Sequence, residues 1–175
     1  TIIRPTIAEM AKRGTPFQGV LFAGLMIENG IARLIEYNVR FGDPECQVLM
    51  VRLGGQILDA LLACAEGRLG QARLNWADDH AVTVVLSAKG YPGAYGKGEV
   101  IGGIDVANAV PGVQVFHAGT ALVDGQITSA GGRVLNVTAR ADSLQAARDL
   151  AYQAVELIDW PGGFYRKDIC HRALG

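Results

Sequence analysis

The sequence of 175 residues predicts an α+β fold in two parts, the second a small, mostly antiparallel β domain with a closing helix. Three observations predict this class. Short valine-rich runs separated by turn residues fill the second half of the chain, as is typical of antiparallel strands. The strongest short hairpin signals occur at Asn29-Gly30 and Asp124-Gly125. Helical periodicity is confined to three stretches, which are Pro5–Arg13, the segment from Pro44 and the segment from Asp142.

Composition excludes several classes of protein. Hydrophobic residues make up 50% of the chain and charged residues 19%, which is too apolar for a disordered protein. With 16 basic and 17 acidic residues, the net charge of -1 gives no sign of nucleic-acid or membrane-surface binding. The apolar runs are too short to span a bilayer. The three cysteines indicate neither a disulfide framework nor a zinc site, so we expect a cytoplasmic protein.

The first part is expected to open with a helix and a hairpin. The segment Pro5–Arg13 is predicted to be helical because proline suits the first turn and Gly14 ends the pattern. Strands are expected over Phe17–Ile27 and Ile31–Val39, joined by the Asn29-Gly30 turn.

A long helix is expected next. Pro44 suits its first position, and Glu45 complements the positive end of the helix dipole. Gly54-Gly55 interrupts the apolar pattern, which predicts a bend or two separate helices. Residues 67–79 are expected to connect the two parts, and we place the domains at 1–78 and 79–175.

The second part is predicted to consist of short strands closed by a helix. The expected strands are His80–Ala88, Val100–Ile104, Val113–Ala118, Ala121–Val123, Ile127–Ala130 and Val134–Ala139. The loop 89–98 contains four glycines and is a candidate lid or hinge. The closing helix is expected to begin at Asp142, with Gln145 completing a capping box.

The segment Glu36–Glu45 carries the candidate chemistry. Alternate residues of a strand share one face and lie roughly 6.6 Å apart, which puts Glu36, Asn38 and Arg40 in a row. A carboxylate and an amide oxygen are suitable ligands for Mg²⁺, and a guanidinium suits a phosphate oxygen. A solvated strand face would show the same alternation. Asp43 lies beside them at a strand-to-helix junction, where exposed N–H groups can receive an anion.

Two further groups of residues have alternative interpretations. Gly131-Gly132-Arg133 could bring backbone N–H groups and a guanidinium to a phosphate, or could form a tight turn before a strand. His117 could act as a general base, but a structural histidine bonded to backbone is favoured because the expected chemistry needs no histidine.

The segment Arg40–Gln47, RFGDPECQ, resembles the signature octapeptide of the phosphoribosylamine–glycine ligase family, also called glycinamide ribonucleotide synthetases. Other segments resemble the same family in the same order, so the resemblance covers the whole chain. They are Arg4–Thr6, Gly19–Met26, Gly90–Gly93 with Lys97-Gly98, Phe116–Thr120, Gly131–Leu135 and Tyr165–Ile169. Cys170 stands where the family's Asp-Ile-Gly run has glycine, which leaves the turn geometry there open.

The resemblance implies the C-terminal part of an ATP-grasp domain followed by the family's C-terminal β-rich domain. It implies ATP-dependent ligation of glycine to 5-phosphoribosylamine through a glycyl phosphate, giving glycinamide ribonucleotide, ADP and phosphate in purine biosynthesis. Mg²⁺ or Mn²⁺ would bridge the ATP phosphates. The N-terminal part of the same enzyme would be the missing partner, so the chain is expected to be inactive alone.

The family motif also implies roles for individual residues. Glu36 and Asn38 would be the metal ligands, and Arg40 would act catalytically against the transferring phosphate. Asp43 and Glu45 would shape the substrate side of the site. Substrate binding is further assigned to Gly131, Gly132 and Arg133.

Two other functions compete with this one. A biotin carboxylase-like ATP-grasp ligase also carries Glu-x-Asn-x-Arg on a strand, but the Gly42–Glu45 continuation argues against it. A non-catalytic module derived from a ligase is the other alternative, against which the intact Glu36, Asn38 and Arg40 set argues.

Overall fold

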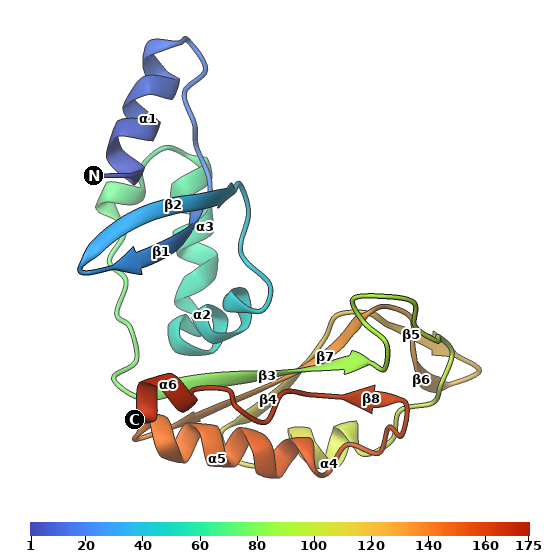
Figure 1. Cartoon of the computed structure of the whole chain (residues 1–175). Coiled ribbons are helices and arrows are strands. Elements are labelled where there is room, and N and C mark those ends of the chain that lie inside the picture. The colour runs from blue at the N-terminus through green and yellow to red at the C-terminus, as the bar shows by residue number, and fades with distance from the viewer. The chain divides into compact units, whose positions relative to one another are not determined.

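The computed structural model describes residues 1–175, which form two compact units (Figure 1). The first unit comprises Thr1–Cys46 and Leu53–Asn75. The second comprises Gln47–Arg52 and Trp76–Gly175. Helices are combined with three antiparallel sheets, which confirms the predicted α+β class.

The first unit contains a helix, a hairpin and a second helix. Its elements are α1 (Ile3–Lys12), β1 (Phe22–Glu28), β2 (Ile31–Asn38), α3 (Gln56–Ala65) and the short 3₁₀ helix η1 (Leu69–Gln71). Helix α2 (Glu45–Leu53) is shared between the units. No single helix of the chain is long and apolar enough to cross a membrane, and only the bent pair α2 and α3 passes that test together.

The β1–β2 hairpin forms at the predicted turn. Asn29 and Gly30 both adopt left-handed backbone conformations, with φ of 51° and 76°, as a type I′ turn requires. The first strand begins at Phe22, five residues later than predicted. A bulge follows, because Gly24 pairs with Glu36 whereas Leu25 pairs with Leu34. The predicted interruption at Gly54-Gly55 is confirmed, since α2 ends at Leu53 and α3 begins at Gln56.

The second unit is built on a four-stranded antiparallel sheet in the order β4-β7-β3-β8, with α5 packed against β3 and β7 (Figure 1). The remaining pair, β5 and β6, forms its own hairpin. The strands are β3 (His80–Ala88), β4 (Val113–His117), β5 (Thr120–Val123), β6 (Gln126–Ser129), β7 (Arg133–Ala141) and β8 (Gly163–Phe164). The helices are α4 (Ile104–Asn108), α5 (Leu144–Val155) and α6 (His171–Leu174).

Alternation along β3 and β7 places the core between the sheet and α5. Val84 and Val137 pair across the two strands and are completely buried. Ala147 and Ala151 of α5 are also completely buried, and their small side chains allow the helix to lie close to the strands. The apolar residues of α5 at helical spacing therefore form a packing surface of the core.

The prediction of a strand over Val100–Ile104 is wrong. Only isolated bridges form, from Val100 to Thr128 and from Gly102 to Asp159, and α4 begins at Ile104. The cause is Gly103, whose φ of 75° turns the chain out of an extended conformation. A Cβ at this position would overlap the carbonyl oxygen of Leu157, so the close approach also requires glycine.

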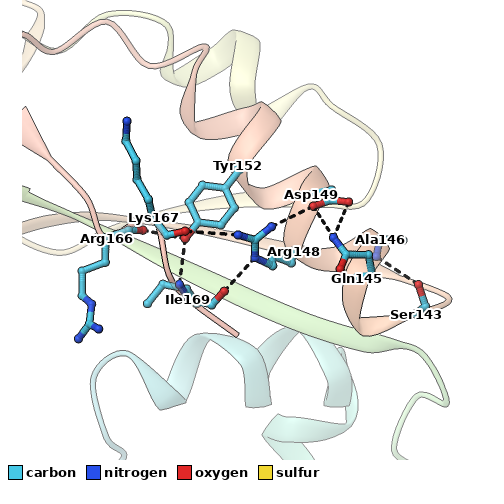
Figure 2. Close-up of polar contacts among 9 residues, drawn as sticks. All are labelled: Ser143, Gln145, Ala146, Arg148, Asp149, Tyr152, Arg166, Lys167 and Ile169. Carbon is cyan, nitrogen blue, oxygen red and sulfur yellow. Dashed lines mark hydrogen bonds and ion pairs between the residues drawn. The ribbon is translucent and has the colours of Figure 1, made fainter. Parts of the chain in front are cut away.

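The N-terminal cap of α5 lies one residue later than predicted. Ser143, not Asp142, is the cap, because its backbone is extended and its hydroxyl oxygen accepts a hydrogen bond from Ala146 N at 3.1 Å. Gln145 does not complete a capping box. Its amide instead donates to both carboxylate oxygens of Asp149 at 2.8 Å, as Figure 2 shows.

The outer face of α5 binds the C-terminal segment, a contact that no local sequence pattern predicts (Figure 2). Arg148 donates from Nε to Ile169 O at 3.0 Å and from Nη2 to Lys167 O at 3.3 Å. Tyr152 donates its hydroxyl to Arg166 O at 2.7 Å and accepts from Ile169 N at 3.1 Å. The Arg148 guanidinium also lies 4.9 Å from the centre of the Tyr152 ring, so both side chains support one another.

Candidate functional site

The head groups of Glu36 and Asn38 lie together on β2. Asn38 Nδ2 donates to Glu36 Oε1 at 3.2 Å. Room for Glu36 is made by its cross-strand neighbour Gly24, where a Cβ would lie 3.2 Å from Glu36 Cγ. The β-bulge beside this pair re-aims the side chains of β2, a device that recurs near functional sites.

The donor set of this pair fits a hard divalent cation. Glu36 supplies a carboxylate, and a half-turn of the Asn38 amide would present its oxygen where the nitrogen now lies. Oxygen ligands of this kind suit Mg²⁺ or Mn²⁺, which commonly take few protein ligands and complete their shell with water and phosphate. Nowhere does the chain gather three or more His, Cys, Asp or Glu side chains suited to a metal ion.

Arg40 lies beyond the end of β2, so the predicted three-residue row on one strand face is wrong for this residue. The strand ends at Asn38, and a bend follows at residues 39–40. Arg40 is exposed and donates from Nη1 to Phe41 O at 2.6 Å. The planar guanidinium keeps further N–H donors beyond this bond, in the arrangement that matches a phosphate.

The loop that follows β2 and the first residue of α2 present two carboxylates, those of Asp43 and Glu45. We call residues 42–45 the acidic loop. Glu45 folds back so closely over Gly42 that a Cβ there would overlap its carboxylate, and Cys46 N donates to Gly42 O at 2.9 Å. The Asp43–Pro44 peptide bond is cis. Burial, and to a lesser degree the charge of Asp43, raises the pKa of the Cys46 thiol. Gly42 therefore leaves room for the Glu45 carboxylate to lie against the backbone of this loop.

The Gly131-Gly132-Arg133 segment belongs to the second unit, where close packing accounts for both glycines. Gly131 N donates to Gly119 O at 3.0 Å, and the two backbones approach so closely that neither residue has room for a side chain. The ring of Tyr91 lies directly against Gly132. Arg133 begins β7 and is half-buried. The turn interpretation therefore explains the two glycines, while the substrate role of the segment stays a prediction.

His117, the last residue of β4, contacts the first residue of β5. Its Nδ1 lies 3.0 Å from Thr120 Oγ1, across the turn that joins β4 to β5. The partner is a side-chain hydroxyl and not the backbone group that was expected of a structural histidine.

Two models of one protein family match the chain. The model described as "Phosphoribosylglycinamide synthetase, C domain" matches residues 81–172. The model described as "Phosphoribosylglycinamide synthetase, ATP-grasp (A) domain" matches residues 1–46. The second match contains Glu36, Asn38, Arg40 and the acidic loop.

Individual proteins give the same result. A phosphoribosylamine–glycine ligase of Brucella melitensis is 53% identical over 173 residues, which are 99% of this chain and 40% of that protein. A chloroplastic phosphoribosylamine–glycine ligase of Arabidopsis thaliana is 54% identical over 178 residues, 99% of this chain and 34% of that protein.

A solved structure matches as well. The crystal structure of a phosphoribosylamine–glycine ligase from Thermotoga maritima superposes with a TM-score of 0.78 at 34% identity, covering 91% of this chain and 39% of that one. The chain thus spans 34–40% of the length of these three relatives. Because the C-domain model alone matches more than half of the sequence, the chain belongs to the phosphoribosylglycinamide synthetase family.

Proposed function

We propose that this chain forms the C-terminal part of a phosphoribosylamine–glycine ligase, which uses ATP to join glycine to 5-phosphoribosylamine. The products would be glycinamide ribonucleotide, ADP and phosphate. The observation that carries the proposal is the meeting of Glu36 and Asn38 head groups at 3.2 Å, two residues before the family's Arg40–Gln47 segment. The names of the relatives, matched over 99% of this chain, support the same activity.

We further propose that residues 1–78 end an ATP-grasp domain and residues 79–175 form the C domain, the rest of the enzyme being the partner. The β1–β2 hairpin supports the existence of such a partner, because Ile27, Ile31 and Ile35 are each more than 60% exposed. So much apolar surface on one hairpin is typical of a face that another part of a protein covers. We place the activity in the cytoplasm, whereas the Arabidopsis relative is named as chloroplastic.

The candidate site residues of the first unit have three different roles in this proposal. Glu36 and Asn38 would hold Mg²⁺ or Mn²⁺ by their oxygens. When bound, the cation would offset charge on the ATP phosphates during transfer to the glycine carboxylate. Arg40 would donate N–H bonds to the transferring phosphate, which keeps it oriented. The carboxylates of Asp43 and Glu45 would accept hydrogen bonds from substrate amines.

The second unit would contribute substrate binding. Arg133 would donate to a phosphate oxygen of the ribosylamine through its guanidinium. Gly131 and Gly132 would support this arginine by allowing the close backbone approach at Gly119 and the packing of Tyr91. The two glycines thus act by shaping the segment.

The decisive experiment replaces Glu36 by Ala in the full-length enzyme. We expect ADP release that depends on glycine and 5-phosphoribosylamine to fall by at least about 100-fold, because a metal ligand is lost. Glu28→Ala is the matched control, since Glu28 lies on the same hairpin and its ion pair with Arg33 is exposed and 4.0 Å long.

Two results would contradict the proposal. Unchanged turnover and unchanged metal dependence of Glu36→Ala would remove this residue from the mechanism. A wild-type enzyme that turns over bicarbonate and biotin, or nothing at all, in a substrate panel would support one of the competing functions instead.

A further inference from the structure

A small polar cavity lies in the second unit. It shares no lining residue with the proposed ligase site, and Ala88 N of its wall donates to Gly132 O at 2.8 Å. Its volume is about 220 Å³. Its walls come from the end of β3, the loop after it, the end of β6 and the turn before β8. The lining residues are Ala88, Lys89, Gly96, Glu99, Ser129, Trp160 and Gly162. Sites for drug-sized ligands occupy about 300–1,000 Å³, so this cavity suits a guest of a few heavy atoms.

Two opposite charges line the cavity, and each is bound to the turn at residues 160–163 and not to the other. Lys89 Nζ donates to Pro161 O at 2.6 Å. Glu99 Oε2 accepts from Trp160 Nε1 at 3.1 Å. The Glu99 carboxylate packs directly on Gly162, where a Cβ would overlap it. The turn therefore holds an ammonium and a carboxylate apart across one space.

The remaining wall is rigid and supplies a hydroxyl group. Ser129 is only 2% exposed, and its Oγ accepts from Glu99 N at 3.2 Å, which leaves the hydroxyl hydrogen available for donation. Backbone bonds fix this wall, because Ser129 N donates to Glu99 O at 2.8 Å and Gly98 N donates to Ser129 O at 2.6 Å. Lys89 and Glu99 are exposed residues, so a guest can enter from solvent.

The charges select the class of guest. A simple anion would be attracted by Lys89 and repelled by Glu99, and a simple cation would meet the reverse. Only a molecule that carries both charges gains at both ends. The Lys89 ammonium has three N–H donors, of which Pro161 takes one, and Glu99 has a second carboxylate oxygen beyond the one bound to Trp160.

We propose that this cavity binds a small α-amino acid as its zwitterion, with the ammonium at Glu99 and the carboxylate at Lys89 and the Ser129 hydroxyl. The site lies outside the metal and phosphate residues assigned above, and the proposal does not rest on the proposed ligase activity. L-Alanine is the probe because it is not the ligase substrate.

Nuclear magnetic resonance of the indole N–H groups tests the proposal directly. The chain has two tryptophans, and Trp160 donates its indole N–H to Glu99 whereas Trp76 lies outside the cavity and serves as the internal reference. Titration with L-alanine is expected to shift the Trp160 signal to saturation and leave Trp76 unchanged. Acetate and methylammonium, each with one of the charges, are expected to bind at least about tenfold more weakly.

Single substitutions test separately the contacts to the carboxylate and to the ammonium group of the bound amino acid. Lys89→Met and Glu99→Gln are each expected to weaken L-alanine binding at least about tenfold, through loss of one charge-assisted hydrogen bond. Lys97→Met is the matched control, because Lys97 lies in the same loop but contacts the Tyr95 ring. Backbone amide signals of the core verify that each variant is folded. A Trp160 signal that does not saturate, acetate binding equal to alanine binding, or full binding by Lys89→Met would each overturn the proposal.

Discussion

Cys170 adopts a left-handed backbone conformation, with φ of 64°, immediately before α6. This conformation is unfavourable for any residue with a Cβ and is suited to glycine, the residue of the family's Asp-Ile-Gly run. The turn geometry that the sequence left open is therefore kept in this chain, at a cost in backbone strain. Half-burial raises the pKa of its thiol, as expected of a side chain packed beside the core.

We expect Cys170→Gly to be more stable than Cys170→Ala by about 0.5–1 kcal/mol, after the greater unfolded-state entropy of glycine is subtracted from the relief of strain. Both variants lose the sulfur, so their difference isolates the backbone term. Thermal unfolding of the two proteins measures it, with an expected gap in melting temperature of about 1–4 °C. Equal melting temperatures would mean that the left-handed conformation carries no strain here.

Tyr165 titrates at unusually high pH. A hydrogen bond to the Glu156 carboxylate, with smaller contributions from burial and from the charge of Glu156, raises the pKa of Tyr165 from 10.0 to about 12. Since the folded-state pKa is the higher one, Tyr165 contributes to stability below about pH 10, and this contribution disappears as the pH rises toward 12.

The phenolate absorbance of the folded chain measures this pKa. The chain has five tyrosines, and we expect Tyr165 to ionise near pH 12. The difference between the titration curves of the unsubstituted chain and of Tyr165→Phe identifies its signal. Glu156→Ala is expected to return it toward 10, because the accepting carboxylate is lost. Ionisation of Tyr165 near pH 10 in the unsubstituted chain would contradict the contact with Glu156.

At the scale of elements, the turns of the two β-hairpins could be predicted from the sequence, whereas the path of the C-terminal segment could not. Asn29-Gly30 and Asp124-Gly125 adopt left-handed conformations at each turn, and such turns depend on the turn residues alone. The segment after α5 has no comparable local signal. Its path depends on Arg148 and Tyr152, which bind it from 14 to 21 residues away in the sequence.

Removing the Tyr152 hydroxyl tests how firmly this segment is held. We expect Tyr152→Phe to raise the hydrogen exchange rate of Ile169 N and to lower the free energy of unfolding by about 1–2 kcal/mol. The reason is that the hydroxyl's hydrogen bonds to Arg166 O and from Ile169 N are both lost. Tyr95→Phe is a suitable control, since Tyr95 packs on Tyr91 by its ring. Unchanged exchange at Ile169 would show that Arg148 alone holds the segment.

At the scale of the whole molecule, the chain would hold only one part of the proposed ligase site. The match to the family's ATP-grasp model covers only residues 1–46, and the relatives extend well beyond this chain. We expect the 175-residue chain by itself to release no ADP above background with ATP, glycine and 5-phosphoribosylamine. Adding the missing N-terminal part of the enzyme is expected to restore release. Activity of the chain alone would show that residues 1–175 suffice for catalysis.

The sequence by itself determined the features that depend on neighbouring residues. These are the α+β class, both hairpin turns, the break between α2 and α3, and the Arg40–Gln47 signature of the family. Each rests on backbone preferences or residue order that no distant contact changed. The pairing of Glu36 with Asn38 also followed from strand alternation, although the end of β2 at Asn38 removed Arg40 from the row.

Only the tertiary structure decided the features that depend on distant residues. Gly103 turned an expected strand into α4 because the chain there passes the Leu157 carbonyl. The cavity between Lys89 and Glu99 arises for the same reason, since a turn more than 60 residues later separates the two charges. Long-range packing, which no local pattern encodes, sets each of these positions.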